Sequence, residues 1–184
     1  MRICFQASDF DGPGAYRCGF LAAELLKRGH DCTIPPYVQT EGPDGRPRFI
    51  YDLKTVPPSP DADIYVAQMR KEPHAAEAFA QLGQWFGKVV VAECDDDYVN
   101  IPSYNAGYKG ALQVRHHLFD GFLNSAAMTV STPALAEVYA RYNPDITVLR
   151  NYLDWPMWED VPQQSEVDRA GRVRVGWMGR LAWR

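Results

Sequence analysis

The fold is decided by a pattern that the chain carries twice, a short apolar strand followed by a glycine turn. The first copy is Met1-Arg-Ile-Cys-Phe-Gln6 before Gly12-Pro-Gly14, and the second is Val173-Arg-Val-Gly-Trp-Met178 before Gly179-Arg180. A strand that delivers a glycine turn to a helix N-terminus favours anions, because the exposed amides and the helix dipole attract negative charge. Two copies predict two nucleotide-type α/β domains, the second of which begins just before Arg184.

Between the two copies, apolar runs alternate with helical patterns, which predicts a doubly wound parallel sheet, a Rossmann-like α/β fold. Helices are expected at 14–28, 74–86 and 108–124, and a fourth should open at Thr132 as N-cap with Pro133 in its first turn. Strands are expected at 1–6, 31–34, 63–67, 88–92, 128–131 and 145–149, with one more at 48–51 inside an irregular, proline-rich excursion over 35–60.

The strand at 88–92 reads Lys-Val-Val-Val-Ala, so we expect it at the centre of the sheet and covered on both faces. The domain boundaries follow from this pattern. Residues 1–151 should form an N-terminal domain, 152–171 a linker, and 172–184 a stub of the second domain. Because its apolar strand has no sheet of its own, the stub is expected to be mobile, or to dock on the first domain or on a second copy of the chain.

Composition excludes several classes of protein. The chain has 184 residues, 46% of them hydrophobic, with a net charge of −4, so neither a small core nor a basic nucleic-acid surface is expected. No apolar run approaches the roughly 18 residues of a membrane span, and no secretory signal opens the chain. The four cysteines form no C-x-x-C pair and are expected to be buried free thiols. These features predict a cytosolic protein.

Ligands of doubly wound sheets bind outside the carboxyl ends of the strands. The segments expected there are 8–17, 68–70, 93–97, 131–132 and 151. In the first of them, Gly12 and Gly14 would let backbone approach a ligand, and Arg17 would add a positive charge at the helix start. The loop lacks the G-x-G-x-x-G fingerprint, because Arg17 stands where its third glycine belongs. A tight turn without a ligand is the alternative.

Glu93-Cys-Asp-Asp-Asp97 places four carboxylates at the end of the most apolar strand. Their mutual repulsion costs free energy unless a cation, backbone amides or a hydroxyl-rich ligand lies nearby. One interpretation is a divalent metal held through the D-x-D spacing of Asp95 and Asp97. Others are recognition of sugar hydroxyls, placement of the loop 98–104, or a solvated acidic turn.

Together these segments resemble the N-terminal half of a GT-B glycosyltransferase, in the sucrose- and glycogen-synthase-like retaining family and its bacterial or phage-associated branch. The resemblance lies in their order and spacing. It covers the glycine loop with its helix ending Arg28-Gly29-His30, Val89 to Glu93 with Asp95-Asp96, Ile101-Pro102, 127–136, Val148-Leu-Arg-Asn151, and 173–180.

The resemblance implies transfer of a sugar from a nucleotide-diphosphate donor to a glycosyl acceptor, with retention of configuration and without a bound metal or other cofactor. It places Gly12 and Gly14 near donor phosphate and acceptor, and Arg180 on the donor diphosphate. The predicted binding set is completed by Arg17, Asp95, Asp96 and Asn151. Many members have a histidine where this chain has Gln68-Met-Arg70, so no catalytic residue is assigned and this chain alone is expected to be inactive.

Two other functions are compatible with these residues. A metal-dependent GT-A glycosyltransferase would use Asp95 and Asp97 on manganese, although its single domain would not begin a new strand and glycine unit at Val173. A truncated, non-catalytic binding module is the second alternative.

Overall fold

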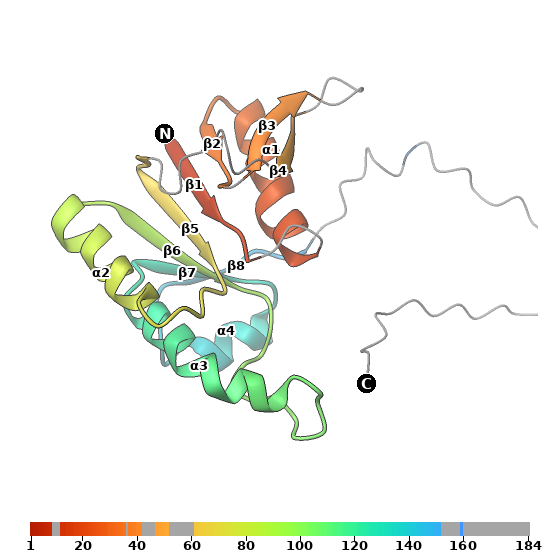
Figure 1. Ribbon diagram of the computed structural model, residues 1–184, viewed down its shortest axis with the longest axis vertical. Helices are drawn as coiled ribbons and strands as arrows, with labels where there is room; N and C mark the ends of the chain where they lie inside the picture. The colour runs from red at the N-terminus through yellow and green to blue at the C-terminus, as the bar shows by residue number, and fades with distance from the viewer. Residues whose placement is uncertain (9–11, 36, 42–46, 52–60, 152–158, 160–184) are drawn as a thin grey trace, which may run out of the picture. The chain divides into compact units, whose positions relative to one another are not determined.

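The computed structural model describes residues 1–8, 12–35, 37–41, 47–51, 61–151 and 159 (Figure 1). A six-stranded sheet with every neighbouring pair parallel runs through the first 151 residues, in the order β2-β1-β5-β6-β7-β8. Its strands are β1 (Arg2–Gln6), β2 (Asp31–Thr33), β5 (Ile64–Gln68), β6 (Val89–Cys94), β7 (Ala127–Val130) and β8 (Ile146–Val148). With helices packed on it, this sheet confirms the predicted doubly wound α/β fold.

The helices also follow the sequence pattern closely. They are α1 (Phe20–Lys27), α2 (Ala75–Phe86), α3 (Tyr108–Leu123) and α4 (Pro133–Tyr139). Gly29 at φ 83° and Gly87 at φ 60° follow the ends of α1 and α2 in the left-handed region that glycine adopts without strain. Thr132 begins α4 as expected, because its hydroxyl accepts a hydrogen bond from the Leu135 amide at 3.2 Å.

The sequence pattern missed two local features. The predicted helix at 14–28 begins with a π-helical turn, η1 (Ala15–Gly19), before α1 continues it. The excursion over 35–60 contains an antiparallel pair, β3 (Tyr37–Glu41) and β4 (Pro47–Tyr51), where we expected only the second strand. Pro47 is the first residue of β4, opposite Glu41 at the end where the two strands are connected, and a residue without an amide hydrogen is tolerated at a strand start.

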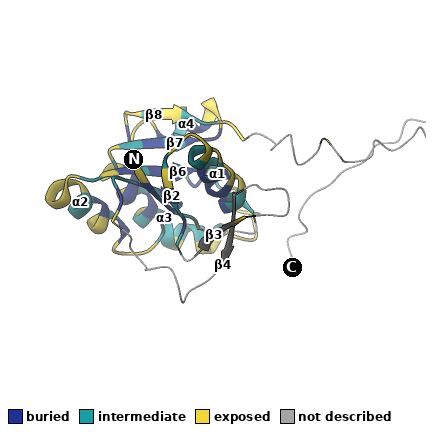
Figure 2. Ribbon diagram, turned by 90° about the horizontal axis from the view of Figure 1, so that it is seen from above, coloured by how far each residue is buried: buried dark blue, intermediate teal, exposed yellow. Residues whose placement is uncertain are grey.

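Alternating side chains of β1 and β5 face opposite sides of the sheet, and each side has its own core. On one face, Ile3 and Phe5 pack with Cys18 and Ala22 of the first helical segment. On the other, helices α2, α3 and α4 contribute to two clusters. Figure 2 shows buried residues in dark blue along the strands and exposed ones in yellow on the outer side of α2. The first contains Cys4, Tyr65, Ala67, Phe79 and Val90, and the second contains Ala92, Cys94, Leu118, Phe122, Met128, Val130, Leu135 and Tyr139. The four cysteines are buried and free, as predicted.

Strand β6 differs from its prediction in one respect. It is central, but its first residues are covered on one face only: Val90 is buried, whereas Val89 is 43% exposed and Val91 is half-buried; Ala92, Glu93 and Cys94, at its end, are all buried. Among the described residues, the second face of β6 is therefore covered only in part.

The proposed linker at 152–171 and the stub at 172–184 fall outside the described residues, apart from Glu159, and so does Arg180. Those predictions stay predictions. Within the described part of the chain, no helix combines the length and apolar character that crossing a bilayer requires.

Tyr139 should be a large single contributor to stability. Its buried hydroxyl donates to the Asp96 carbonyl at 2.6 Å and accepts from the Tyr98 amide at 2.9 Å. Tyr139→Phe leaves both backbone groups without this partner and should lower the free energy of unfolding by about 1–3 kcal/mol. Urea denaturation measures the change. Tyr142→Phe, in a half-buried ring stacked on Phe119, is the matched control and should change stability far less; equal effects would contradict the assignment.

Candidate functional site

The order of the strands identifies the edge of the sheet at which a ligand is expected. β2 lies on one side of β1 and β5 on the other. The order of the strands along the chain therefore changes direction at β1. Such a switch point opens a crevice at the carboxyl ends of the two strands. Ser8 follows β1 there, and Gln68 ends β5.

The glycine loop enters the helical segment at this crevice. The Ala15 amide donates to the Gly12 carbonyl at 2.9 Å, and Gly14 precedes the π-helical turn η1. A π turn places one more residue in the turn than an α-helix does, and such turns occur frequently at functional sites. Here the turn carries two neighbouring polar side chains, Tyr16 and Arg17.

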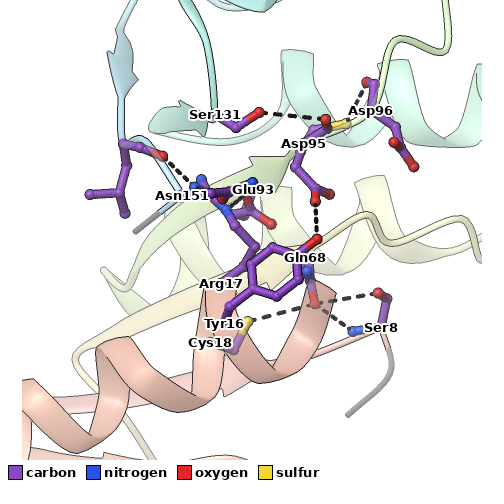
Figure 3. Close-up of polar contacts among 12 residues, drawn as sticks. Ser8, Tyr16, Arg17, Cys18, Gln68, Glu93, Asp95, Asp96, Ser131 and Asn151 are labelled. Carbon is purple, nitrogen blue, oxygen red and sulfur yellow. Dashed lines mark hydrogen bonds and ion pairs between the residues drawn. The ribbon is translucent and has the colours of Figure 1, made fainter. Parts of the chain in front are cut away.

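Arg17 extends into the protein rather than into solvent. Its side chain is 2% exposed, and its Nε donates to Glu93 Oε1 at 2.6 Å (Figure 3). Its Nη1 donates to the Leu149 carbonyl and, at 3.0 Å, to Asn151 Oδ1. The guanidinium therefore joins the first helical segment to the end of β6 and to the chain that leaves β8.

Glu93 is the counter-charge of Arg17, and its own side chain is 2% exposed. Burial raises its pKa to about 7, because a carboxylate loses hydration inside the protein; Arg17 lowers the pKa and the Asp95 charge adds to the rise. The carboxyl group consequently exchanges its proton close to neutral pH. A titration at this position changes the charge of the whole crevice.

Gln68 lies beside Glu93, because the two residues are paired in register across β5 and β6. Its fully buried Oε1 accepts from the Ser8 amide at 3.0 Å and from the Ser8 hydroxyl at 3.3 Å. The next residue, Met69, has φ 43°, a conformation that non-glycine residues rarely adopt, and its amide donates to the Glu93 carbonyl at 2.8 Å. Strain of this kind is concentrated at functional sites.

The three aspartates after β6 have different environments. Asp95 is half-buried and accepts from the Tyr16 hydroxyl at 3.3 Å. Burial, and then the neighbouring Asp96 charge, raise its pKa. Asp96 is exposed. Burial opposes ionisation of Asp97, but hydrogen bonds from Asn100 and Val99 outweigh it and hold its pKa below the usual value.

The Asp97 carboxylate is therefore used to hold the turn that follows it, one of the roles that the sequence left open. No group of three or more His, Cys, Asp or Glu side chains in the described ranges is arranged to hold a metal ion.

Several buried polar atoms of the crevice lack a hydrogen-bond partner. They are Arg17 Nη2, Gln68 Nε2, Glu93 Oε2 and Asp95 Oδ1. The Gln68 side chain nevertheless hydrogen-bonds Glu93 closely enough to lower its pKa, so the cost of a buried group without a partner, roughly 1–3 kcal/mol, applies in full only to Arg17 Nη2 and Asp95 Oδ1. The set contains both donors and acceptors. A hydroxyl group can bind either kind of atom, because it both donates and accepts a hydrogen bond.

A separate hollow lies elsewhere on the described part of the chain. It has a volume of about 350 Å³ and is lined by Phe79, Gly83, Lys88, Leu123, Ser125 and Ala126, among others. Lys88 and Ala126 precede strands β6 and β7, so this hollow is at the amino ends of the strands, away from the polar cluster. We place the functional site by its chemistry and by the switch point rather than by this volume.

The predicted site residues divide into three groups. Arg17 and Asn151 share a hydrogen bond, and Asp95 accepts one from Tyr16, the neighbour of Arg17; Gly12 and Gly14 belong to the loop that leads into the same turn. Asp96 follows Asp95, with its side chain exposed, and Arg180 lies outside the described residues. Ligand binding by all of these residues stays a prediction.

The sequence-based binding set omitted Tyr16, Gln68 and Glu93. For the last two a signal existed, since both stand at the ends of neighbouring parallel strands, where side chains of equal register lie side by side. Neither protein-family models nor curated proteins match this chain.

Glu93 should make stability fall as pH rises. Its pKa is raised in the folded protein, so the folded state binds a proton more tightly than the unfolded chain between about 4.5 and 7. The stabilisation is complete below this window and is lost as pH rises through it. The free energy of unfolding of the unmodified protein minus that of Glu93→Gln should decrease across the window, as measured by urea denaturation at several pH values.

Glu24→Gln is the control for this titration. Glu24 is exposed, and its pKa is lowered by Arg28 and Lys27, so its contribution changes only below the window. The corresponding difference should stay constant between roughly pH 5 and 7, because a carboxyl group with a lowered pKa is already ionised there and the histidines titrate alike in both proteins. A constant difference for Glu93→Gln as well would show that the carboxyl group is not titrating there.

Proposed function

We propose that this chain is the acceptor-side part of a glycosyltransferase, which moves a sugar from a nucleotide-diphosphate donor to a hydroxyl-bearing acceptor. The observation that supports the proposal most strongly is the buried polar cluster at the switch point. There a glycine loop at the start of a helical segment adjoins a buried cluster that offers both hydrogen-bond donors and acceptors. Few ligands need both features, and an activated sugar with its acceptor is one of them.

The two features suit different parts of such a substrate pair. Backbone amides of a glycine loop suit phosphate oxygens, because they donate hydrogen bonds and approach closely. Carboxylate and amide side chains suit hydroxyl groups, which can donate and accept at once. Arg17 is neutralised by Glu93, so the proposal assigns the main cationic contact with the donor diphosphate to Arg180.

The metal-dependent GT-A alternative receives less support. It needs Asp95 and Asp97 to turn together toward one cation, but both oxygens of Asp97 accept hydrogen bonds from its own turn. The same residues support the alternative of a binding module without catalysis equally well. Only an assay of sugar transfer separates that alternative from the proposal.

The proposal is tested by donor binding. Isothermal titration of the protein with UDP-, GDP- and ADP-sugars should find one that binds, equally well with manganese and with chelator. Arg180→Ala should weaken this binding by about 1.5–3 kcal/mol, roughly 10- to 150-fold, because a charge-assisted hydrogen bond is lost. Arg172→Ala, a matched loss of charge in the same tail, should leave the affinity unchanged.

Three outcomes would contradict the proposal. Absence of binding by every donor, in the protein expressed from its entire reading frame, would remove it. Binding that requires manganese and is lost in Asp95→Asn would favour the metal-dependent alternative. Donor binding without transfer to any acceptor would leave only the binding module.

A further inference from the structure

Large apolar side chains are exposed where helices α2 and α3 end, and we call them the helix-end patch. Trp85 and Phe86 close α2 and are 70% and 64% exposed, and Leu123 closes α3 and is 59% exposed. The two helices pack closely, because a Cβ added at Gly121 of α3 would lie 3.3 Å from the ring of Phe79 in α2. Clustered apolar side chains of this kind mark surfaces for association.

The hollow between α2 and α3 lies beside this patch. Gly83 and Gln84, which directly precede Trp85, line it from α2, and Leu123 lines it from α3. Its volume of about 350 Å³ falls within the roughly 300–1,000 Å³ of pockets that enclose drug-sized ligands. An aromatic side chain therefore fits inside it, so the same surface has both a protruding ring and a recess.

Trp85 and the hollow lie on opposite flanks of α2. Successive residues of an α-helix are rotated by about 100° around its axis, so Trp85 is turned by about 200° from Gly83, which lines the hollow. A two-fold axis that runs along the exposed side of α2 exchanges these flanks. It places the Trp85 of each copy over the hollow of the other, which is the reciprocal contact of an isologous dimer.

The charges at this edge of the sheet allow two copies to approach. Lys88, which lines the hollow, pairs with Asp61 at 2.7 Å. Arg2 pairs with the same carboxylate at 2.9 Å and with Asp63 at 3.2 Å. The network thus has no net charge, and its cations can face the carboxylates of a second copy. The exposed Glu77 lies in the first turn of α2, at the other end of the helix from the patch.

The area of the patch indicates a reversible dimer. An aromatic side chain buries about 150–250 Å², so Trp85 and Phe86, each about two-thirds exposed, offer roughly 200–330 Å² together. A standard interface buries about 800 Å² on each partner, of which the two rings supply about a third. The remainder falls to Leu123 and to the polar side chains around the hollow.

We propose that this surface is a dimer interface of the chain, in which the Trp85 of each copy enters the hollow of the other. The proposal goes beyond the transferase function and does not depend on it. Because the polar cluster lies at the carboxyl ends of the strands and the hollow at their amino ends, this dimer leaves the candidate functional site open.

Sedimentation velocity of the 184-residue chain over a range of concentrations tests the proposal. The unmodified protein should pass reversibly from monomer to dimer as its concentration rises. Trp85→Ala should raise the dissociation constant of the dimer by about tenfold or more, because central aromatic anchors dominate interfaces. Tyr104→Ala is the matched control. Tyr104 is 90% exposed in the loop before α3, so its loss should leave the dissociation constant unchanged.

A second pair of variants tests the hollow. A Cβ added at Gly83 meets only the Lys88 carbonyl, at 3.8 Å, so Gly83→Gln keeps the helix and fills part of the hollow. This variant should weaken the dimer as Trp85→Ala does. Gly110→Gln in α3, where an added Cβ meets no atom within 4 Å, should leave the dimer intact. Urea denaturation checks that all four variants remain folded.

A mixture of the two weakened variants gives the sharpest result. Trp85→Ala keeps its hollow and Gly83→Gln keeps its tryptophan, so a mixed pair restores one of the two contacts. The mixture should associate more tightly than either variant alone. A chain that stays monomeric at every concentration would overturn the proposal. So would a dimer that neither variant weakens, or a mixture that associates no better than its components.

Discussion

The buried ion pair between Arg17 and Glu93 is the interaction on which the carboxyl edge of the sheet depends. A guanidinium taken out of water needs a counter-charge and several hydrogen bonds. Without them, the free-energy cost of losing its hydration would exceed the stabilisation gained from packing. Glu93 supplies the charge at 2.6 Å, and Leu149 and Asn151 supply acceptors. One side chain thereby fixes three parts of the chain that are far apart in sequence.

This constraint explains the rest of the crevice. Because the guanidinium is directed inward, the neighbouring Tyr16 is left at the surface, where its hydroxyl reaches Asp95. Because Glu93 is held against Arg17, Gln68 in the same register is held next to it and reaches back to Ser8. The strained backbone at Met69 follows the same strand end. The polar cluster is thus a consequence of one buried charge and of the strand register.

Much of the fold could be predicted from local sequence signals, because those signals have local causes. Gly29 ends its helix through a backbone conformation that glycine adopts freely, and Thr132 caps its helix through a contact three residues away. The strand β3 could not be predicted in the same way, since pairing with β4 compensates for a segment rich in helix and strand breakers.

The role of Arg17 shows the limit of such reasoning at the site. Its sequence position predicted a charge available to a ligand, but its partner lies 76 residues away at the end of another strand. Nothing in the local sequence reveals that partner, although the order of the sheet does. The π turn that directs Arg17 inward likewise has no sequence signal that we could identify.

A double-mutant cycle on the buried pair tests this account most directly. Free energies of unfolding are measured for Arg17→Met, Glu93→Leu and the double variant, at a pH well above 7 so that Glu93 is ionised. Each single variant leaves a buried charge without its partner and should cost about 3–5 kcal/mol, whereas the double variant should be at least as stable as either single one. Additive losses, with no coupling between the two positions, would contradict the central place of this ion pair.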